Sequence, residues 1–422
     1  MRNRIALIAA VLVVAGAIVA SILLPTTPPS EQTISLPVSR MLACPVGDST
    51  VGKTVVTVTD QENFVAGELN ALPADPTTNV SLENPQKPII VRGSATVAGV
   101  STYTETTRGM VVPCAPPITV GAWNGITIGD SSTLVFTNVD ATPAVVDVFL
   151  YNQLGPIAQP GLRDIPVASG VTRMWPIDST TSDTPVSVTI RASKGRVAAV
   201  LRTIGDGGYD WQLPQTSPDT DLVIAGIPAG DGNRSLSIMN TDSVNKAQIS
   251  VEIISESGSF APLGLETIEI APSRATSVDI TGSLGGQASA VHLVSDRPVT
   301  ATVVLTGGDI AGISAQPALN GAVVFPGVGG TLWIANPGDD LATLTMDSND
   351  GNGVTTTDTI DVTAHTIASI PFPSSGTVKL TTESSVVRTS LVLDSPSLSI
   401  LPISGGGIVT SVPVPHVAPG LG

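Results

Sequence analysis

The sequence predicts an all-β protein, built of tandem immunoglobulin-like or fibronectin-like β-sandwich domains after one N-terminal transmembrane helix. Three observations predict this fold class. The chain of 422 residues is dominated by Val, Thr, Ala, Ile and Ser and is rich in Gly and Pro, which favour strands and turns. One strand-like stretch recurs three times, each time followed by the same series of short apolar segments. An uncharged apolar run stands at the N-terminus.

The recurring stretch lies at Ser132–Asn138, Arg234–Asn240 and Gly330–Asn336, with Leu at its third position, Phe or Ile at its fifth and Asn at its end. Alternating apolar positions predict a half-buried strand, and a closing Asn predicts a turn. We therefore expect core positions and turn formers in three equivalent domains. The expected core positions are Leu134, Phe136, Leu236, Ile238, Leu332 and Ile334, and the expected turn formers are Asn138, Asn240 and Asn336.

The N-terminal run predicts a membrane anchor. Arg2 and Arg4 precede the apolar residues 5–24, which as a helix rising about 1.5 Å per residue span the hydrocarbon core of about 30 Å. The basic residues predict a cytoplasmic stub at residues 1–4 and an extracytoplasmic location for the bulk of a single-pass membrane protein. A cleaved signal peptide is the alternative, because Ala15-Gly16-Ala17 resembles a cleavage site. Residues 25–33 form a Pro-rich spacer.

Residues 34–118 are expected to form a first β domain bounded by the two cysteines. Cys44 and Cys114 both lie in the exported part, where a disulfide is the simplest outcome. Closing a loop of about 70 residues would stabilise the domain by roughly 4 kcal/mol. Free thiols or a metal site are the alternative. The segment Ile89–Val100 resembles part of the later repeats, so this domain is expected to hold a partial fourth copy, while Asn70–Lys87 is expected to be a loop.

Three sandwich repeats are expected at residues 119–203, 222–306 and 322–394. Gly205–Asp221 and Gly307–Gly321 are expected to connect them as a string of domains, and residues 395–422 to form a C-terminal strand and tail. In each repeat the Asn is followed by a second strand and then by two short arms around a small-residue turn, as at Ile165–Ile177. A hairpin is expected to close each repeat, as at Val188–Arg202.

The order of short motifs resembles the actinobacterial domain-of-unknown-function family 5719. The motifs are Cys44-Pro45, Pro113-Cys114, the series Trp123, Ser132, Leu134 and Asn138, the stretch Gly195–Leu201, and Val412-Pro413-Val414. The resemblance covers most of the chain after the anchor. It implies an exported, membrane-attached envelope protein and adds no catalytic residue.

Two matches to catalytic motifs are expected to be fortuitous. Gly47–Thr54 fits the phosphate-loop pattern GxxxxGK[ST], but a strand-like segment follows where the phosphate loop requires a helix. Ser243–Lys246 fits the Ser-x-x-Lys pair of penicillin-recognising enzymes, but it lies between two strands and no Lys-Thr-Gly accompanies it. Both segments are therefore expected to be polar loops or turns.

Two further features have a structural and a binding interpretation. Asp347–Gly353 is oxygen-rich, as calcium loops are, but position 358 is Asp rather than the Glu of an EF-hand, and a hairpin tip is the simpler expectation. The aromatic residues are expected mainly to fill cores or to cap the contacts between domains, with sugar stacking as the alternative. Trp333 alternates with core positions and is expected to face outward; the others are Trp123, Trp175 and Tyr209-Asp210-Trp211.

The net charge of −16 and the lack of clustered Lys and Arg argue against nucleic acid as a partner, and none is expected. His292, His365 and His416 are far apart in sequence and no recurring Ser or Asp accompanies them, so no catalytic triad is expected. The sequence thus predicts no enzyme activity and no catalytic, cofactor-binding or metal-binding residue. It predicts an envelope protein with a structural or protein-interaction role, or alternatively a cell-wall glycan-binding module, and it does not indicate an oligomeric state.

Overall fold

The computed structural model describes residues 33–35, 40–45, 50–58, 65–70, 79–83, 85–93, 97–105, 108–126, 131–177, 185–205, 208–352, 354–384, 386–394, 397–404 and 411–413. In these ranges the chain is almost entirely β, which confirms the all-β prediction, and the one helix they contain is the short α2 (Thr281–Leu284). No helix within them is long and apolar enough to span a membrane. The expected stub at 1–4, the anchor at 5–24 and most of the spacer at 25–33 lie outside the described residues.

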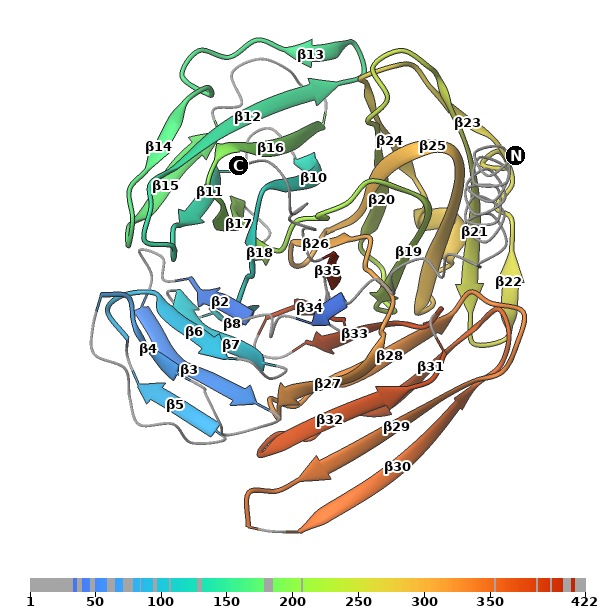
Figure 1. Cartoon of the computed structure of the whole chain (residues 1–422). Coiled ribbons are helices and arrows are strands. Elements are labelled where there is room, and N and C mark those ends of the chain that lie inside the picture. Colours follow the sequence, from blue (N-terminus) through green and yellow to red (C-terminus); the bar gives the residue numbers. More distant parts are fainter. Residues whose placement is uncertain are drawn as a thin grey trace, which may run out of the picture. The chain divides into compact units, whose positions relative to one another are not determined.

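The chain forms two compact units. In the smaller one, β1 (Thr33–Ser35) pairs antiparallel with β35 (Ser411–Pro413). The larger one, Ser39–Gly407, contains four β-sandwiches, each made of two antiparallel sheets (Figure 1). Sandwich 1 packs the sheet β2-β6-β4 against the sheet β5-β3-β7-β8. Its strands are β2 (Arg40–Cys44), β3 (Thr50–Val58), β4 (Val65–Glu68), β5 (Asn79–Glu83), β6 (Ile89–Gly93), β7 (Val97–Glu105) and β8 (Arg108–Pro113).

Sandwich 2 packs the sheet β10-β16-β12-β13, with β14 beside β12, against the sheet β15-β11-β17-β18, with β9 beside β17. Residues from both sheets, including Leu134, Val148 and Ile190, form one apolar core. Its strands are β9 (Pro117–Ile118), β10 (Val120–Ile126), β11 (Ser131–Thr137), β12 (Ala144–Asn152), β13 (Gly155–Ile157), β14 (Ile165–Val167), β15 (Thr172–Ile177), β16 (Val186–Lys194), β17 (Val197–Gly205) and β18 (Gly208–Gln212).

Sandwiches 3 and 4 repeat this arrangement. In sandwich 3 one long strand, β25, takes part in both sheets. The strands of sandwich 3 are β19 (Asp219–Ile227), β20 (Asn233–Asn240), β21 (Ala247–Ser255), β22 (Gly258–Phe260), β23 (Ile268–Ile270), β24 (Ala275–Asp279), β25 (Ser289–Thr306) and β26 (Ala311–Ser314). Those of sandwich 4 are β27 (Gly321–Pro326), β28 (Thr331–Asn336), β29 (Ala342–Asn349), β30 (Thr355–Val362), β31 (Thr366–Pro371), β32 (Thr377–Thr382), β33 (Arg388–Leu393) and β34 (Ser399–Ile403).

The four sandwiches share one topology. In sandwiches 1 to 3 a residue two or three positions beyond the last strand forms a bridge with the first strand, at Ala43–Ala115, Ala122–Gln215 and Val223–Gln316. Sandwich 1 also has the strand order of the later copies, with β6 and β7 at the positions of β16 and β17. The region before the three recognised repeats is therefore a fourth copy with both sheets, where the segment Ile89–Val100 alone predicted a partial one. Within the described residues it has no counterpart of β13 or β14.

The predicted closing hairpin is wrong. β16 pairs with β10 and β12 in one sheet, whereas β17 pairs with β11 and β18 in the other, and the two strands do not pair with each other. Gly195, at a φ of 66°, lies in the turn between them. Both strands are apolar on one face because they close the same core from opposite sides. Alternation along two neighbouring strands cannot distinguish this crossing from a hairpin.

Strands also occupy segments that were expected to be connectors or loops. β18 and β26 lie within Gly205–Asp221 and Gly307–Gly321 and pair with β17 and β25. Similarly, β5 lies within the expected loop Asn70–Lys87 and pairs with β3. These strands are short, and each contains a Gly or an Asn within a longer segment of turn-forming residues, so composition alone favours turns.

The two arms predicted after the second strand belong to different sheets. β14 pairs with β12, and β15 pairs with β11, so the turn between them crosses the outer edge of the sandwich. The corresponding pairs are β23 and β24 in sandwich 3 and β30 and β31 in sandwich 4.

The repeated Asn joins these parts. Asn336 is fully buried; its Nδ2 donates to the carbonyl oxygens of Asp340, Val362 and Thr363, and its Oδ1 accepts the N–H of Gly338. Asn138 and Asn240 make the corresponding bonds. Each Asn therefore forms a turn, and it also ties the end of the repeated strand to the outer edge of its sandwich. All six expected core residues are buried.

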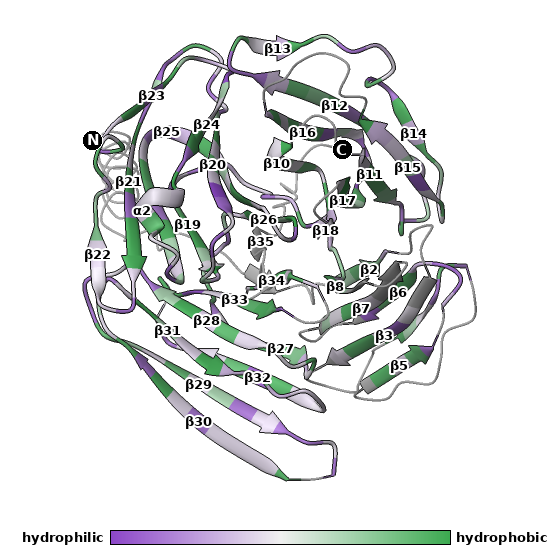
Figure 2. Cartoon of the chain, turned by 180° about the vertical axis from the view of Figure 1, so that it is seen from behind, coloured by the Kyte–Doolittle hydropathy of each residue, from purple (hydrophilic) through white to green (hydrophobic). Residues whose placement is uncertain are grey.

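Within Ser39–Gly407 the sandwiches are arranged in a closed ring (Figure 1). The first strand of each packs on the next sandwich: β10 on β20 and β25, β19 on β28 and β33, and β27 on β3 and β7. The first strand of sandwich 1 follows the same rule and completes the ring. Ala43 of β2 shares an apolar cluster with Val135 and Val200 of sandwich 2. Strands β8, β18, β26 and β34 lie innermost, next to one another. Figure 2 shows apolar inner strands such as β17 and β33, whereas the outermost strand β30 is mostly polar and exposed.

The junctions differ in chemistry. Junctions 1–2 and 4–1 are apolar, around Val200 and Val100. At junction 2–3 the buried Asn124 is hydrogen-bonded to Thr300 and Thr302, with distances of 3.2 and 3.3 Å. At junction 3–4 Gln316 Nε2 donates to Ser390 Oγ at 2.9 Å, and Ser390 Oγ donates to the carbonyl of Ala225. Such buried polar bonds require specific partners, so they fix which faces meet.

Candidate functional site

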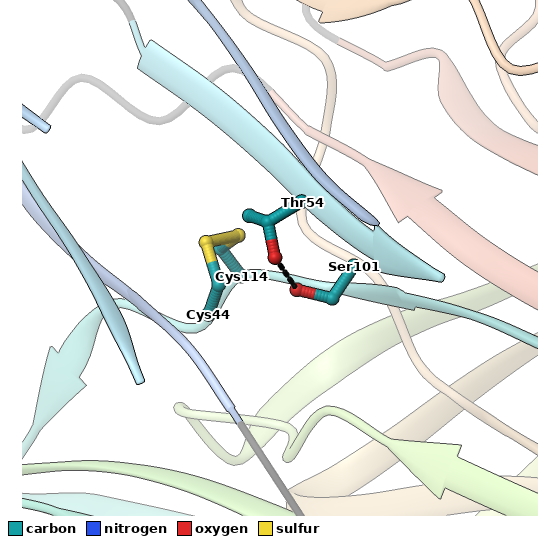
Figure 3. The surroundings of a disulfide bond; sticks show 4 residues. All are labelled: Cys44, Thr54, Ser101 and Cys114. Carbon is teal, nitrogen blue, oxygen red and sulfur yellow. Dashed lines mark hydrogen bonds between the residues drawn. A yellow bond between two sulfur atoms is a disulfide. The ribbon is translucent and has the colours of Figure 1, made fainter. Parts of the chain in front are cut away.

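The disulfide predicted in sandwich 1 is confirmed between Cys44 and Cys114 (Figure 3). Cys44 occupies the position that Trp123, Ile224 and Phe325 hold in the other sandwiches, so the disulfide replaces a large apolar residue. Gly99 lies beneath it, and a Cβ at Gly99 would come within 2.7 Å of Cys114 Sγ. The disulfide therefore belongs to the core of sandwich 1.

A polar pair lies beside the disulfide. The hydroxyl oxygens of Thr54 and Ser101 are 2.8 Å apart and fully buried (Figure 3). They stand where sandwich 2 has the apolar pair Leu134 and Leu201. Sandwich 1 thus buries less apolar area at the position of Thr54 and Ser101 than sandwich 2 does at the position of Leu134 and Leu201. The disulfide offsets this smaller stabilisation by constraining the unfolded chain.

Neither of the two motifs that match catalytic patterns, Gly47–Thr54 and Ser243–Lys246, lies in a catalytic arrangement. Thr54 and its neighbour Lys53 lie within strand β3, not at the start of a helix; Gly47 lies outside the described residues. Lys246 pairs with Glu269 at 2.6 Å on the surface. Asp350, in the oxygen-rich segment, accepts the backbone N–H groups of Asn352 and Val354 at the tip between β29 and β30. In the described ranges no three His, Cys, Asp or Glu side chains are grouped to hold a metal ion.

The histidines form pairs with carboxylates. His292 on β25 lies 2.8 Å from Asp221 and 3.5 Å from Glu252, and His365, in a turn, lies 2.9 Å from Asp339. His416 is outside the described residues. No serine hydroxyl is bonded to either described histidine. These contacts are polar pairs without the nucleophile that a catalytic triad requires.

An unusual carboxyl lies near the centre of the ring. Asp210 on β18 accepts the N–H of Gly312 on β26 at 2.7 Å. Burial raises the pKa of Asp210 to about 7, against the lowering effect of hydrogen bonds from Gly312 and Trp211, and the nearby Asp309 raises it further. The residue keeps some accessible surface, but protein surrounds its carboxyl. Ser399 makes the equivalent bond to the N–H of Val111 between sandwiches 4 and 1. These side chains therefore join neighbouring inner strands.

Asp210→Asn is expected to stabilise the protein at pH 8 by about 1–3 kcal/mol, to stabilise it less at pH 5, and to have little effect below about pH 4. The folded pKa of about 7 is above the unfolded value of about 4, so the contribution of this group is fully present below about pH 4. That contribution is lost as the pH rises to about 7, whereas Asn is neutral throughout and still accepts the N–H of Gly312. Urea unfolding at pH 5 and pH 8 measures the difference.

Asp242→Asn is the matched control. Hydrogen bonds from Asn245 and Val244 lower the pKa of Asp242 to about 2, so its contribution is present above about pH 4 and is lost only as the pH falls toward 2. Its effect on stability should be the same at pH 5 and pH 8. The stability difference between Asp210→Asn and the wild type should grow in favour of the variant from pH 5 to pH 8. A difference that instead shifts in favour of the wild type would contradict the raised pKa of Asp210.

A small cavity of about 160 Å³ lies where the inner strands end, lined by residues such as Pro116, Leu213, Ile313 and Pro402. Its amide side chains are already engaged: Gln212 Nε2 donates to Ser314 Oγ, and Gln316 is bonded to Ala225 and Ser390. A polar ligand would have to break these bonds, so the cavity is better suited to holding the ring together than to recognition.

A larger cleft of about 320 Å³ lies between sandwiches 1 and 2. Its polar groups are also engaged. Arg92 Nη2 donates to the carbonyl of Val139, and Asp140 forms an ion pair with Arg196 at 2.8 Å, which lowers the pKa of Asp140. Asn70 Nδ2 donates to the carbonyl of Gly170. The polar groups named here are therefore satisfied within the protein.

The third cleft differs. It lies between sandwiches 3 and 4, has a volume of about 400 Å³ and is called here the Trp333 cleft. Its lining includes Pro228, Gly230, Asn233, Arg234, Gly308, Asp309, Trp333, Asp394 and Leu398. Among the described residues, the side chains of Asn233 and Asp394 have no hydrogen-bond partner, and both residues are exposed. Unengaged polar groups beside an aromatic ring are what a binding cleft presents.

Trp333 lies on the face of β28 opposite the core residues Leu332 and Ile334, as its alternation with them predicts. It packs beside the cluster of Val223, Ala225 and Ala335 and remains partly exposed in the cleft. The sequence also held a signal that was missed. Arg234 stands where the other repeats have Ser132 and Gly330, and Trp333 stands where they have Val135 and Ser237. Departures from the repeat therefore coincide with the cleft.

Together these features define an all-β repeat protein in a ring. At one junction a cleft brings Trp333 together with the unengaged side chains of Asn233 and Asp394. The model of a family described as a family of unknown function, DUF5719, matches residues 92–373, and the chain belongs to this family, as the motif resemblance predicted. No curated protein and no solved structure matches the chain.

Proposed function

We propose that this chain is a non-catalytic interaction protein of the cell envelope, held on the extracytoplasmic side of the membrane by residues 5–24. In this proposal the ring is a rigid platform whose junctions and outer loops contact other envelope proteins. The individual sandwiches are taken to be immunoglobulin-like or fibronectin-like modules. Binding surfaces on such modules lie mainly in loops, because the sheet faces are covered.

The observation that carries the proposal is the closure of four sandwiches into one ring. Each sandwich covers a sheet face of its neighbour, and bonds such as Asn124 to Thr302 and Gln316 to Ser390 fix the junctions. A rigid arrangement presents several loops at fixed distances, which reduces the entropy lost on binding a large partner. The buried Cys44–Cys114 disulfide supports an oxidising compartment.

Crosslinking in intact cells tests this function. The full chain with a C-terminal affinity tag is crosslinked, the membranes are solubilised, and captured proteins are identified by mass spectrometry. Protease added outside the cells is expected to remove the tag, because the C-terminus lies on the extracytoplasmic side in this proposal. The captured material is expected to contain a reproducible set of extracytoplasmic proteins. The matched control carries residues 1–33 on an unrelated secreted β domain, and a captured set identical to that of this control would contradict the proposal.

The alternative function is binding of cell-wall glycan. The Trp333 cleft favours it, because two of its polar side chains, Asn233 and Asp394, have no hydrogen-bond partner in the described part of the chain. The polar groups named for the cleft between sandwiches 1 and 2 are already bonded.

A further inference from the structure

We propose that the Trp333 cleft is a binding site for a neutral or N-acetylated sugar of a polysaccharide. The proposal goes beyond a platform for proteins: it assigns one site, its residues and the chemical class of its ligand. It rests on the proposed extracytoplasmic location only for access to such a polysaccharide, and not on any protein partner.

The aromatic wall is the first argument. The neighbouring apolar cluster holds Trp333 from one side, so its ring has little freedom to move and part of it faces the cleft. Its indole N–H has no hydrogen-bond partner among the described residues. A fixed indole offers a flat apolar face to the C–H groups of a sugar ring and an N–H to a hydroxyl.

The polar groups are the second argument. The amide of Asn233 and the carboxylate of Asp394 project from exposed positions on the lining and can each bond to hydroxyl or acetamido groups. Arg234, only 4% exposed, has an Nε without a partner in the described part of the chain. Its other nitrogens donate to the carbonyls of Gly232 and Pro228. Arg234 thereby holds the loop that forms one wall of the cleft.

The charge of the lining selects the ligand class. One guanidinium, Arg234, is accompanied by the carboxylates of Asp309 and Asp394, so the cleft has no excess of positive charge. An anionic ligand such as a phosphate polymer or an acidic peptide would meet two carboxylates and gain little from one engaged arginine. A neutral, hydroxyl-rich ligand uses the same groups as donors and acceptors without this cost.

The size and rim of the cleft are consistent with one or two sugar rings. Its volume of about 400 Å³ lies at the lower end of the usual range for small-molecule sites. Gly230, Gly232, Gly307 and Gly308 line it and carry no side chain that would block a polymer passing through. Gly308 is exposed, and a Cβ there would meet no atom within 4 Å.

Gly308 permits a sharp test. Gly308→Phe is expected to place a ring over the cleft without disturbing the fold. Gly282→Phe is the matched control, because Gly282 is also exposed in sandwich 3, also has no atom within 4 Å of a Cβ, and does not line the cleft. The probes are tetra-N-acetylchitotetraose and cellotetraose, with a polyphosphate as the anionic comparison. Titration calorimetry on the full chain measures binding.

Binding of at least one of the two sugars is expected, weakened about tenfold or more by Gly308→Phe and by Trp333→Ala, but changed less than about threefold by Gly282→Phe. Trp333→Phe keeps the flat apolar face and loses the indole N–H, so it should weaken binding less than Trp333→Ala does. Polyphosphate is expected not to bind. Failure of both sugars to bind, binding that Gly308→Phe leaves unchanged, or polyphosphate binding that Trp333→Ala abolishes would each overturn the assignment. Circular dichroism and thermal unfolding establish that the variants fold. Because the captured envelope proteins are measured separately, either proposal can fail alone.

Discussion

Asn336→Ala is expected to lower the free energy of unfolding by about 3–5 kcal/mol, more than substitution of most single polar residues would. The buried amide satisfies the carbonyl oxygens of Asp340, Val362 and Thr363 and the N–H of Gly338. Alanine would leave these backbone groups without their partner in a place that water reaches poorly. Urea unfolding of the purified chain, followed by tryptophan fluorescence and circular dichroism, measures the loss.

Two further variants separate the contribution of the Asn336 amide from the effect of substituting any Asn in a turn. Asn336→Asp retains an acceptor for Gly338 but replaces the Nδ2 donor with an oxygen that faces three carbonyls. It should therefore destabilise the protein at neutral pH at least as much as alanine, and less at low pH, where the carboxyl is protonated. Asn352→Ala, at the exposed tip between β29 and β30, should change stability by less than about 0.5 kcal/mol. Equal effects of Asn336→Ala and Asn352→Ala would show that the repeated Asn is only a turn former.

Removal of the disulfide is the other large effect. The double variant Cys44→Ala, Cys114→Ala is expected to lose about 4 kcal/mol, since the two residues are 70 apart in sequence and the open chain gains the entropy of that loop. Loss of packing adds to this, because the pair fills the position that Trp123 fills in sandwich 2. Comparison of urea unfolding for the oxidised wild type and the double variant measures the difference.

Gly99 provides an independent check on the packing. Gly99→Ala should destabilise the wild type by about 1–3 kcal/mol, because its Cβ would lie 2.7 Å from Cys114 Sγ. In the double variant both sulfur atoms are gone and only Val56 Cγ2, 3.2 Å from the added Cβ, stays close, so the same substitution should cost clearly less than in the wild type. An equal cost in both backgrounds would mean that Gly99 is required for a reason other than the disulfide.

Repetition made much of the fold predictable. Because three copies repeat the same alternation, chance patterns in one copy are unlikely to recur, and the repeated strand, the second strand and the arms around the outer turn were recognised from residues such as Leu134 and Asn138. The disulfide followed from cysteine number and context alone. Trp333 could be placed away from the core because side chains alternate along a strand.

Other features depended on contacts between distant segments. β16 and β17 look like a hairpin because each alternates in the same way, and only their partners, β12 and β11, show that they lie in opposite sheets. The fourth copy was hard to recognise because Cys44, Thr54 and Ser101 replace the apolar residues that mark the other three. The bonds of Asn336 to Val362 and Thr363 join backbone groups that carry no sequence signal.

The sequence by itself determined the all-β class, the repeated sandwich strands, the disulfide and the family, because alternation, cysteine number and short motifs are local properties. Only the tertiary structure decided that four sandwiches close into a ring and that Asn233, Arg234, Trp333 and Asp394 line one cleft. The physical reason is that these four residues belong to two different sandwiches, and what brings them together is the packing of β19 on β28 and β33. No pattern within either repeat encodes that contact.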